Sequence, residues 1–345
     1  MSQPTANLAA VLPSPGAKLV IEERPIPTPG PDELVVRNHA IALNPIDWKR
    51  IDLNIALPTY PAIIGSDVSG IVTAVGSNVT AFQPGDRVLA AGPGMGTGNP
   101  DHAAYQTYTV VPASIAAKLP DALAFRDAAA AVTSTSTPAL ALFDVLGLPA
   151  PESAAKPPTN TGILVWGAAS SMGTGTVQLA RLAGLKVFAT ASPQHHARVR
   201  ALGATAVVDY RSPTAVEDLV AAAKEAGVNV ALAVDSISTD DTLPLVVDFL
   251  AKFDGPKKVA HLLQWPEHVA KPADVEAAWV AGFRIWSARK DLSEMVFNRL
   301  LTGWLEKGEV VPGPVRVIDG GLGGLQTALD VLRKGVSGEK LVVEV

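Results

Sequence analysis

One stretch decides the fold: Gly162-Ile-Leu-Val-Trp-Gly-Ala-Ala-Ser-Ser-Met-Gly-Thr-Gly175. Its apolar start is typical of a buried strand and its small residues of a tight turn. The apolar spacing over 177–183 is typical of a helix, and 186–191 reads as a second buried strand. This order favours the first unit of a nucleotide-binding α/β fold, in which a pyrophosphate reaches N–H groups at the helix N-terminus. The turn alone is a weak signal, because an ordinary βαβ unit with a crowded turn has the same pattern.

The composition is that of a globular chain long enough for two domains. The 345 residues are 48% hydrophobic and 18% charged, with a net charge of −5 and no basic block, which argues against nucleic acid or an anionic membrane as a partner. The absence of cysteine excludes disulfides, thiolate metal ligands and cysteine nucleophiles. The start lacks the features of a signal peptide, and no apolar run reaches the roughly 18–20 residues that span a bilayer. We therefore expect a cytoplasmic protein.

Residues 8 to about 120 are rich in strand signals separated by glycine and proline. The strand candidates are 34–41, which alternates like a half-buried strand, 63–75, 82–90 and 105–111. This pattern predicts a small barrel-like β domain. A helical segment opens at Phe125, and we expect the hydroxyl run Thr133-Ser-Thr-Ser-Thr137 to interrupt it, with Pro138 able to begin a new helix.

From residue 162 onward, strand and helix signals alternate. The strand candidates are 163–166, 187–191, 206–210, 228–234 and 258–263, and the helix candidates between them are 177–183, 198–202, 215–226 and 243–253. This alternation predicts a parallel sheet with helices on both faces. Ile285-Trp286 is a candidate sixth strand and otherwise a dimer edge or a pocket wall. Residues 292–305 have helical spacing, and we expect the part after about 310 to pack back on the first domain, with a final strand at 341–345.

The segment after the second α/β strand bears on the choice of cofactor. In NAD-binding folds an acidic residue there binds the ribose 2′-hydroxyl, but Thr190-Ala-Ser-Pro-Gln-His-His-Ala-Arg198 contains no acid. Ser192 can donate a hydrogen bond to a 2′-phosphate, so the sequence favours NADPH. Positive charge is available from His195, His196, Arg198 and Arg200, although the histidines fit an exposed helix start equally well. Tyr210 either packs on the adenosine end of the cofactor or is an edge-strand aromatic residue.

Several motifs, in this order, resemble the medium-chain dehydrogenase/reductase superfamily. Besides the turn at 162–184 they are Ala42-Leu-Asn-Pro-Ile-Asp-Trp-Lys49, Tyr60-Pro-Ala-Ile-Ile-Gly-Ser-Asp-Val-Ser-Gly70, Val75-Gly-Ser-Asn-Val79, Phe82-Gln-Pro-Gly-Asp-Arg-Val88, Leu202-Gly-Ala-Thr-Ala-Val-Val-Asp-Tyr210 and Gly335-Val-Ser-Gly-Glu-Lys340. Within the superfamily the chain is similar to zinc-independent quinone oxidoreductases. It is more similar to the fungal trans-acting enoyl reductases of polyketide biosynthesis, a branch of secondary metabolism.

The resemblance implies an α/β protein of two domains. A GroES-like, β-rich catalytic domain is expected over 1–125 and 310–345, and a Rossmann domain with a doubly wound parallel sheet, which binds NADPH, over 126–309. It also implies an NADPH-dependent oxidoreductase that reduces the C=C bond of α,β-unsaturated carbonyl substrates of the enoyl or enone type. The substrate is expected to be a small molecule or a carrier-bound acyl chain.

The resemblance also assigns site residues position by position. The expected cofactor contacts are Ile46, Asp47, Trp48 and Lys49 in a loop beside the cofactor; Ala169, Ser170, Ser171, Met172 and Gly173 at the pyrophosphate; Ser192, Pro193, Gln194, His195 and Tyr210 at the 2′-phosphate and adenosine; Leu262 and Leu263 near the nicotinamide; and Ser337 and Gly338. The expected substrate contacts are Tyr60, Thr133, Ser134, Thr135, Ser136, Thr137, Phe283 and Trp286.

Two departures from the superfamily bear on the chemistry. In zinc alcohol dehydrogenases a cysteine ligand occupies the loop near 44–47, and a His-Glu pair follows the glycine that is Gly65 here. This chain has Ser66-Asp67 and no cysteine, so we expect no metal. The hydroxyl run at 133–137 stands where relatives carry a Pro-Val-Gly-type segment, which predicts a more polar pocket wall.

Without a metal, hydrogen bonds or a cation must polarise the substrate carbonyl. After hydride transfer to the β-carbon, the developing enolate oxygen needs donors, and Thr137, Thr133, Ser136 or backbone N–H groups are the candidates. Lys49 is the candidate acid or enolate-stabilising cation, and otherwise a surface lysine that holds the cofactor ribose.

Two neighbouring residues have equally open roles. Asp47 either orients Lys49 or caps a helix that starts at Trp48. Tyr60 is a second candidate acid and otherwise packs beside Pro61.

Two other functions remain open at this point. One is NADPH-dependent reduction of quinones or other carbonyl compounds at the same cofactor site. The other is a non-enzymatic, NADPH-binding role that resembles that of ζ-crystallin. The sequence also leaves open whether the protein is a monomer or a homodimer.

Overall fold

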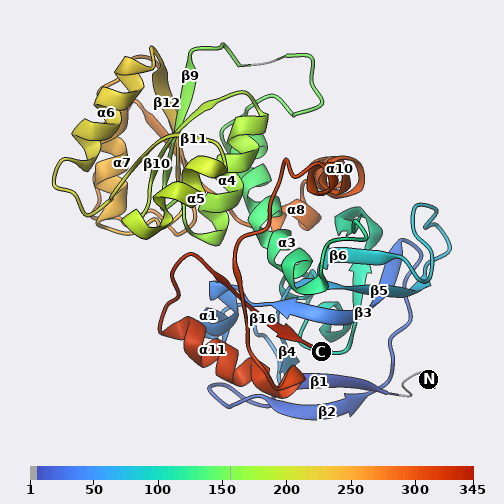
Figure 1. Cartoon of the computed structure of the whole chain (residues 1–345). Helices are drawn as coiled ribbons and strands as arrows, with labels where there is room; N and C mark the ends of the chain where they lie inside the picture. Colours follow the sequence, from blue (N-terminus) through green and yellow to red (C-terminus); the bar gives the residue numbers. More distant parts are fainter. Residues whose placement is uncertain (1–5, 156) are drawn as a thin grey trace. The chain divides into compact units, whose positions relative to one another are not determined.

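The computed structural model describes residues 6–155 and 157–345, which form two compact units (Figure 1). The first unit contains the described residues up to 133 together with 283–308 and 312–345, and the second contains 134–282 and 309–311. The predicted domain ranges, 1–125 with 310–345 and 126–309, differ from these units chiefly at 283–308. Positions 1–5 and 156, which fall within the predicted first domain and an expected loop before the central strand, lie outside the described residues.

The first unit is rich in β-structure. Its strands are β1 (Asn7–Leu12), β2 (Val20–Arg24), β3 (Glu33–Ala42), β4 (Ala62–Ile63), β5 (Asp67–Val75), β6 (Arg87–Ala91), β7 (Tyr108–Pro112), β8 (Ala116–Lys118), β15 (Val315–Val317) and β16 (Lys340–Glu344). Its helices are α1 (Pro45–Leu53), α2 (Gly94–Thr97), α8 (Arg284–Ser287), α9 (Lys290–Ser293), α10 (Leu301–Glu306) and α11 (Leu325–Arg333), and α3 (Phe125–Ala139) begins in this unit. Short 3₁₀ turns cover Pro100–His102, Ala113–Ile115 and Gly321–Gly324.

β3 is the central strand of this unit. It pairs antiparallel with β5, β7 and β16 in a sheet of order β15-β16-β3-β5-β6-β8, and a smaller sheet has the order β2-β1-β4. The prediction of a half-buried strand was wrong for β3, because both of its faces are covered. Leu34 and Ile41 belong to the main core, whereas Ala40 and Ala42 pack with Ala129 of α3.

The C-terminal part packs back on this unit, as predicted. β16 pairs with β3, and α11 is tied to α1 by a bidentate contact in which Arg333 donates to both carboxylate oxygens of Asp52 at 2.8 and 2.9 Å. Such a two-bond guanidinium–carboxylate contact fixes orientation better than a single ion pair does.

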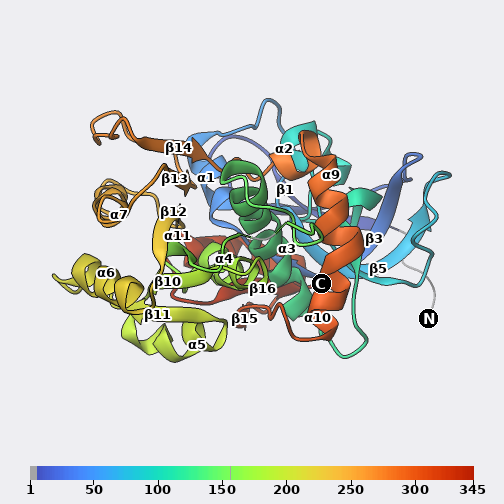
Figure 2. The same ribbon diagram turned by 90° about the horizontal axis from the view of Figure 1, so that it is seen from above.

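Residues 284–287 and 290–306 are helical, so the sixth strand predicted at Ile285-Trp286 was wrong. Ile285 is fully buried in α8, and α9, a π-helical stretch (Glu294–Leu300) and α10 follow as one continuous rod (Figure 2). Asn298 donates to the carbonyls of Ala113 and Ala116 at 2.9 and 2.8 Å, which attaches the rod to the β unit. The helical spacing predicted over 292–305 is confirmed.

The second unit is an open, entirely parallel sheet. Its strands are β9 (Thr161–Trp166), β10 (Lys186–Thr190), β11 (Ala204–Val208), β12 (Asn229–Asp235), β13 (Lys257–His261) and β14 (Val275–Trp279), in the spatial order β11-β10-β9-β12-β13-β14. Its helices are α4 (Ser171–Leu182), α5 (His196–Ala201), α6 (Ala215–Glu225) and α7 (Thr242–Leu250), with a 3₁₀ turn at Pro193–His195. Numbered within the unit, this order is 3-2-1-4-5-6, the Rossmann arrangement.

Helices cover both faces of this sheet, as the alternation of signals predicted. Leu164 and Trp166 of β9 pack with Leu219 of α6 and Phe249 of α7 in one core cluster. Alternate residues of a strand point to opposite faces, and Ile163 is also fully buried, so the other face is covered as well. α4 and α5 follow β9 and β10 on that side (Figure 1).

The hydroxyl run does not interrupt α3, and that prediction was wrong. α3 continues through Pro138 to Ala139 and passes into a π-helical stretch, Leu140–Val145. The run stays helical because it is packed: Ser134, Thr135, Ser136 and Thr137 are all at least 91% buried. Pro138 has no N–H for the Ser134 carbonyl. The Ser134 carbonyl oxygen instead faces Gly175 of α4. A side chain on Gly175 would not fit there, because its Cβ would lie 1.6 Å from this oxygen.

Candidate functional site

The turn between β9 and α4 forms the first part of the candidate site. Gly167 has φ +77°, and a Cβ there would lie 2.6 Å from the Ile237 side chain. The turn is fixed to the end of β10, because Gly167 N–H donates to Thr190 Oγ1 at 3.0 Å and Ala168 N–H to the Thr190 carbonyl at 2.8 Å. A Cβ on Gly173 would lie 2.3 Å from the Gly167 carbonyl oxygen, so both glycines are needed for this close approach of helix and strand.

Ser170 caps α4. Its Oγ accepts the Gly173 N–H at 3.0 Å, which leaves its own proton available for a ligand. Ala169, Ser170 and Ser171 are partly exposed, whereas Met172 is buried. The N-terminus of this 12-residue helix is thus accessible at a rigid, small-residue turn, and its N–H groups and dipole suit an anion such as a pyrophosphate.

A cation lies beside this turn. Arg198 of α5 donates to the Ala169 carbonyl at 3.2 Å and reaches Thr174 Oγ1 at 3.5 Å. Burial lowers the pKa of Arg198. No carboxylate among the described residues forms an ion pair with its guanidinium group. Of the four cations that the sequence offered near the 2′-phosphate, Arg198 is therefore the one attached to the turn. His196 instead bonds the Ala191 carbonyl at 2.9 Å, and burial lowers the pKa of His195.

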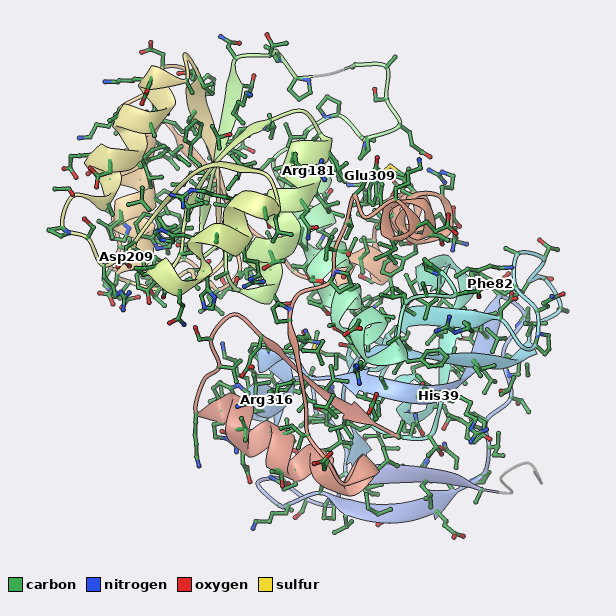
Figure 3. The ribbon with its side chains drawn as sticks, viewed as in Figure 1. His39, Phe82, Arg181, Asp209, Glu309 and Arg316 are labelled. Atoms are coloured by element: carbon green, nitrogen blue, oxygen red, sulfur yellow. The ribbon has the colours of Figure 1, made fainter. Side chains whose placement is uncertain are left out.

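Ser192 and Tyr210 lie together at the ends of β10 and β11. Their hydroxyl oxygens are 3.5 Å apart, and Tyr210 is 44% exposed. The acid nearest in sequence, Asp209 (Figure 3), is engaged by Arg211, which lowers the pKa of Asp209 through a side-chain hydrogen bond. The described side chains at this edge thus offer hydroxyls and an open aromatic ring. Pro193, Gln194 and His195 form the 3₁₀ turn between them.

The carboxyl ends of β12, β13 and β14 expose three large apolar side chains. Ile237, Leu263 and Trp279 are 40%, 39% and 41% exposed, and their strands are neighbours in the sheet. The Trp279 indole N–H donates to the Leu262 carbonyl at 2.9 Å, while Leu262 N–H donates to Ser238 Oγ at 2.8 Å. Leu262 and Leu263, the residues expected near the nicotinamide, thus lie on an apolar edge at which ligands of such sheets bind.

Asp235 holds the turn that supports this edge. Its carboxylate accepts from the N–H groups of Ile237 and Ser238, both at 2.9 Å, and from Thr242 Oγ1 at 2.6 Å. Burial raises the pKa of Asp235, although these bonds oppose the shift. They keep Ser238 at φ +59°, an unusual backbone conformation for a residue with a side chain.

In the first unit, the candidate residues 46–49 form the start of α1. The helix begins at Pro45, not at Trp48 as predicted, and Asn44 is its N-cap. Lys49 is half-buried, with Nζ 5.7 Å from the centroid of the Trp48 ring. Within the described part of the chain, no carboxylate lies in ion-pair range of Lys49.

Asp47 is not the N-cap of a helix that starts at Trp48, one of the two roles left open for it; it is the third residue of α1, and its side chain accepts from the N-cap residue in a capping box. Its Oδ2 accepts the Asn44 N–H at 2.8 Å and the Tyr105 hydroxyl at 3.1 Å. Burial raises the pKa of Asp47 to about 6, with a further increase from Asp67, and that of Tyr105 well above its usual range. Asp47 is only 2% exposed, so it acts by holding the start of α1 in place and not by direct contact with solvent or a ligand.

This raised pKa predicts a pH dependence of stability. The folded chain binds a proton at Asp47 more tightly than the unfolded chain, whose value is near 3.8, so stability falls as pH rises from about 4 to 6. The shift is equivalent to about 3 kcal/mol. Asparagine does not titrate, so Asp47→Asn lacks this loss. The free energy of unfolding of Asp47→Asn minus that of the parent, measured by urea unfolding, should therefore rise by up to about 3 kcal/mol from pH 4 to pH 7.5. A difference that does not change with pH would contradict this expectation.

Lys340 connects three segments of the first unit. Its ammonium group donates to Asn44 Oδ1 and lies 3.5 Å from Asp67 Oδ2. Asp67 is fully buried and also accepts from Ser66 Oγ at 3.0 Å and from Thr133 Oγ1 at 2.7 Å. Thr133 was one of the alternative donors to an enolate, and in the structure its hydroxyl proton is bound to Asp67.

The remaining candidate residues are dispersed. Tyr60 donates to Asn54 Oδ1 at 2.7 Å, so its proton is also engaged. Thr137 is 9% exposed, and its Oγ1 lies 3.4 Å from the point where a Cβ on Gly282 would be. Ser337 is exposed and Gly338 has φ +68° in the loop before β16.

Trp286 lies in α8, and none of the other expected substrate residues lines the same pocket, so its expected contact with the substrate stays a prediction. With Phe82 it lines a surface pocket of about 350 Å³ in the first unit. Phe283 is the N-cap of the same short helix, α8.

Sequence reasoning missed Trp279 and Lys340. β14, which carries Trp279, is five residues long and does not alternate cleanly in polarity, so its only signal was the sixth position that a Rossmann sheet requires. Lys340 was quoted within a motif, but nothing in a single sequence shows that a lysine near the C-terminus bonds to residues 44 and 67.

A chain that contains a Rossmann sheet with an accessible helix N-terminus and also a separate β-rich unit fits the class of two-domain dinucleotide-dependent enzymes. Comparisons with known proteins agree. A family described as "Alcohol dehydrogenase GroES-like domain" matches residues 30–121, and one described as "Zinc-binding dehydrogenase" matches residues 171–255.

Similarity to individual proteins extends over nearly the whole chain. The trans-enoyl reductase tndF of Aspergillus flavipes is 38% identical over 97% of this chain and 98% of its own length. The trans-enoyl reductase tazE of Aspergillus terreus is 39% identical over 75% of this chain and 86% of its own. An alcohol dehydrogenase superfamily protein from Novosphingobium aromaticivorans has the same fold, with a TM-score of 0.79, 23% identity and coverage of 98% and 99%.

The chain belongs to the medium-chain dehydrogenase/reductase superfamily, among relatives that include fungal trans-enoyl reductases. It is therefore an oxidoreductase of a family that binds nicotinamide cofactors. In the described residues, no helix combines the length and apolar character needed to cross a bilayer.

Proposed function

We propose that this protein uses NADPH to reduce the C=C bond of an α,β-unsaturated carbonyl substrate, by hydride transfer to the β-carbon and without a metal. The observation that carries the proposal is the similarity to trans-enoyl reductases, at 38% identity over 98% of the length of one of them. The substrate is a small molecule or an acyl chain on a carrier.

Two features support NADPH as the cofactor. The residues fit a dinucleotide, because the glycines at 167 and 173 keep the turn free of side chains where a pyrophosphate would meet N–H groups. No acid lies in residues 191–198 after β10, where Ser192 is beside Tyr210 and Arg198 contacts the Ala169 carbonyl, which supports a 2′-phosphate over a free ribose hydroxyl. When bound, NADPH supplies the hydride.

The donor set does not fit a zinc ion. A zinc site with the family's arrangement would use the loop near 44–47 and the pair after Gly65, which is Ser66-Asp67 here. The acceptor positions of Asp67 are taken by hydroxyls and by Lys340, and that ammonium would repel a dication at the same place. Among the residues with described positions, no cluster of three or more His, Asp or Glu side chains is close enough to hold a metal ion.

In the proposed reaction, side chains of the protein polarise the substrate carbonyl group and deliver the proton to the α-carbon. Lys49 has no carboxylate partner among the described residues, so its charge is available to a developing enolate or its proton to the α-carbon. Thr137 and Ser136 are the remaining hydroxyl candidates for the enolate oxygen, beside backbone N–H groups, since the Thr133 proton is engaged.

Ser192→Asp tests the choice of cofactor. A carboxylate at this position should accept the ribose 2′-hydroxyl of NADH and repel the 2′-phosphate of NADPH, which lowers the NADPH/NADH ratio of kcat/KM by roughly 100-fold. Ser192→Ala, which loses the donor without adding charge, should lower the ratio by about tenfold or less. If Ser192→Asp keeps the parent's ratio, the 2′-phosphate binds elsewhere.

The reaction itself is tested by NADPH oxidation with enones, enoyl thioesters, enals and quinones, followed by product analysis. Saturated carbonyl products from the first three classes support the proposal. Oxidation of NADPH with quinones alone would favour the quinone reductase alternative, and tight NADPH binding without turnover on any class would favour a non-enzymatic role.

A further inference from the structure

The buried carboxylate of Asp67 has a donor at each of its acceptor positions. Oδ1 accepts from Thr133 Oγ1 at 2.7 Å and from Ser66 Oγ at 3.0 Å. Oδ2 accepts from the Thr133 backbone N–H at 3.2 Å and lies 3.5 Å from the Lys340 ammonium. An ionised carboxylate has about four such positions and no proton to donate. Every polar contact of Asp67 is thus an accepted bond.

The geometry leaves the Thr133 hydroxyl with one role. A hydroxyl has a single proton, and that of Thr133 is bound to Asp67. The bond is held at both ends, because the Thr133 N–H also donates to Asp67 and because Lys340 is itself anchored on Asn44. The lone pairs of Thr133 Oγ1 remain, and toward any third group this oxygen is an acceptor.

We propose that Thr133 is a specificity-determining residue that accepts a hydrogen bond from the substrate, with Asp67 and Lys340 as positioning residues. Thr133 is partly exposed, whereas Asp67 and Lys340 are buried, so of these three residues Thr133 is the one that a ligand can reach. The substrate therefore carries an N–H or O–H donor near its unsaturated carbonyl group. An enolate oxygen at Thr133 would face lone pairs and be repelled. The inference rests on the proposed function.

Matched substrate pairs that differ in one donor test this assignment. One pair is an enoyl thioester of N-acetylcysteamine and its N-methylated amide, and the other is a γ-hydroxy enone and its γ-methoxy analogue. The parent should prefer the donor-bearing member of at least one pair by about tenfold in kcat/KM. Thr133→Val should lower that preference to about one through KM, while Thr133→Ser should retain it. Unchanged NADPH affinity shows that each variant is folded.

Several outcomes would overturn the assignment. A preference that survives in Thr133→Val contradicts it. A kcat that falls equally for both members of a pair indicates a donor to the enolate instead. The double variant Asp67→Leu, Lys340→Met removes the acceptor of the Thr133 proton without leaving an unpaired charge, so it should also lose the preference, and retention would remove Asp67 from the positioning role.

Saturated analogues of the same compounds test the assignment of Thr133 independently of the proposed reaction, because calorimetry measures their affinities without turnover. No NADPH oxidation with any of the four substrates, but a donor preference in binding that Thr133→Val abolishes, contradicts the proposed function and supports the assignment of Thr133. Turnover without any donor preference supports the function and contradicts the assignment.

Discussion

Lys340→Met is expected to lower the stability of the first unit by about 3–5 kcal/mol, because it leaves the fully buried Asp67 carboxylate without its cation. The methionine has nearly the same length and keeps the apolar packing of the lysine stem, so the loss reports on charge. Differential scanning calorimetry should show a fall of roughly 10 °C in the transition of this unit. A variant that unfolds at the parent's temperature would show that Lys340 does not stabilise Asp67.

Two controls isolate the charge pair. Lys307→Met removes an exposed lysine of the same unit and should change stability by less than about 0.5 kcal/mol. The double variant Asp67→Asn, Lys340→Met removes both charges and should recover most of the loss, since breaking a buried pair costs more than replacing it. If the double variant is as unstable as Lys340→Met, the loss arises from packing.

Lys49→Ala is expected to lower kcat by about 100-fold while changing the dissociation constant of NADPH by less than about threefold. The reason is that Lys49 is the half-buried cation of the α1 start, without a carboxylate partner among the described residues, and its charge is available to the reaction. Stopped-flow reduction and fluorescence titration of NADPH give the two quantities. An unchanged kcat would remove Lys49 from the mechanism, and a large rise in the dissociation constant alone would assign it to the cofactor ribose.

Lys49→Arg distinguishes the two chemical roles of this residue. Arginine keeps the positive charge but does not release its proton near neutral pH. Activity close to that of the parent therefore indicates a cation that stabilises the enolate, and a loss as large as that of alanine indicates a proton donor. Lys334→Ala, at an exposed position of the same unit, is the matched control and should leave both quantities unchanged.

The second unit could be predicted from sequence because its signals are local. The buried strand at 163–166, the small-residue turn and the helix that follows are consecutive, and each βα repeat adds the same pattern. The strands near 163, 187, 206, 228 and 258 all exist, with ends shifted by no more than two residues. β14 was missed because its sequence, Val275-Glu-Ala-Ala-Trp279, has no run of β-branched residues and is mixed in polarity.

The errors at the hydroxyl run and at Ile285-Trp286 arise where tertiary packing overrides local preference. The hydroxyl run favours a helix break by itself, but it is buried between helices at a carbonyl that Gly175 approaches closely, so the helix continues. Ile285-Trp286 has strand propensity, but Ile285 is buried in a helix whose neighbours bond to the loop at 113–116. No local pattern encodes such contacts.

The candidate site divides in the same way. The turn at 167–173 and the acid-free end of β10 were identified from spacing, since their chemistry lies within one βαβ unit. The Asn44, Asp67, Thr133 and Lys340 network joins residues separated by up to 296 positions, so only the structure reveals it. Its consequence, that Thr133 accepts and does not donate, depends on the direction of one hydrogen bond.

The most direct test of the account is reduction of an enoyl thioester with NADPH deuterated at C4, with the product analysed by mass spectrometry and NMR and the protein by metal analysis. We predict a saturated thioester with one deuterium at the β-carbon, formed by a protein that contains no stoichiometric zinc. Deuterium at the carbonyl carbon, or a full equivalent of zinc that activity requires, would contradict the account.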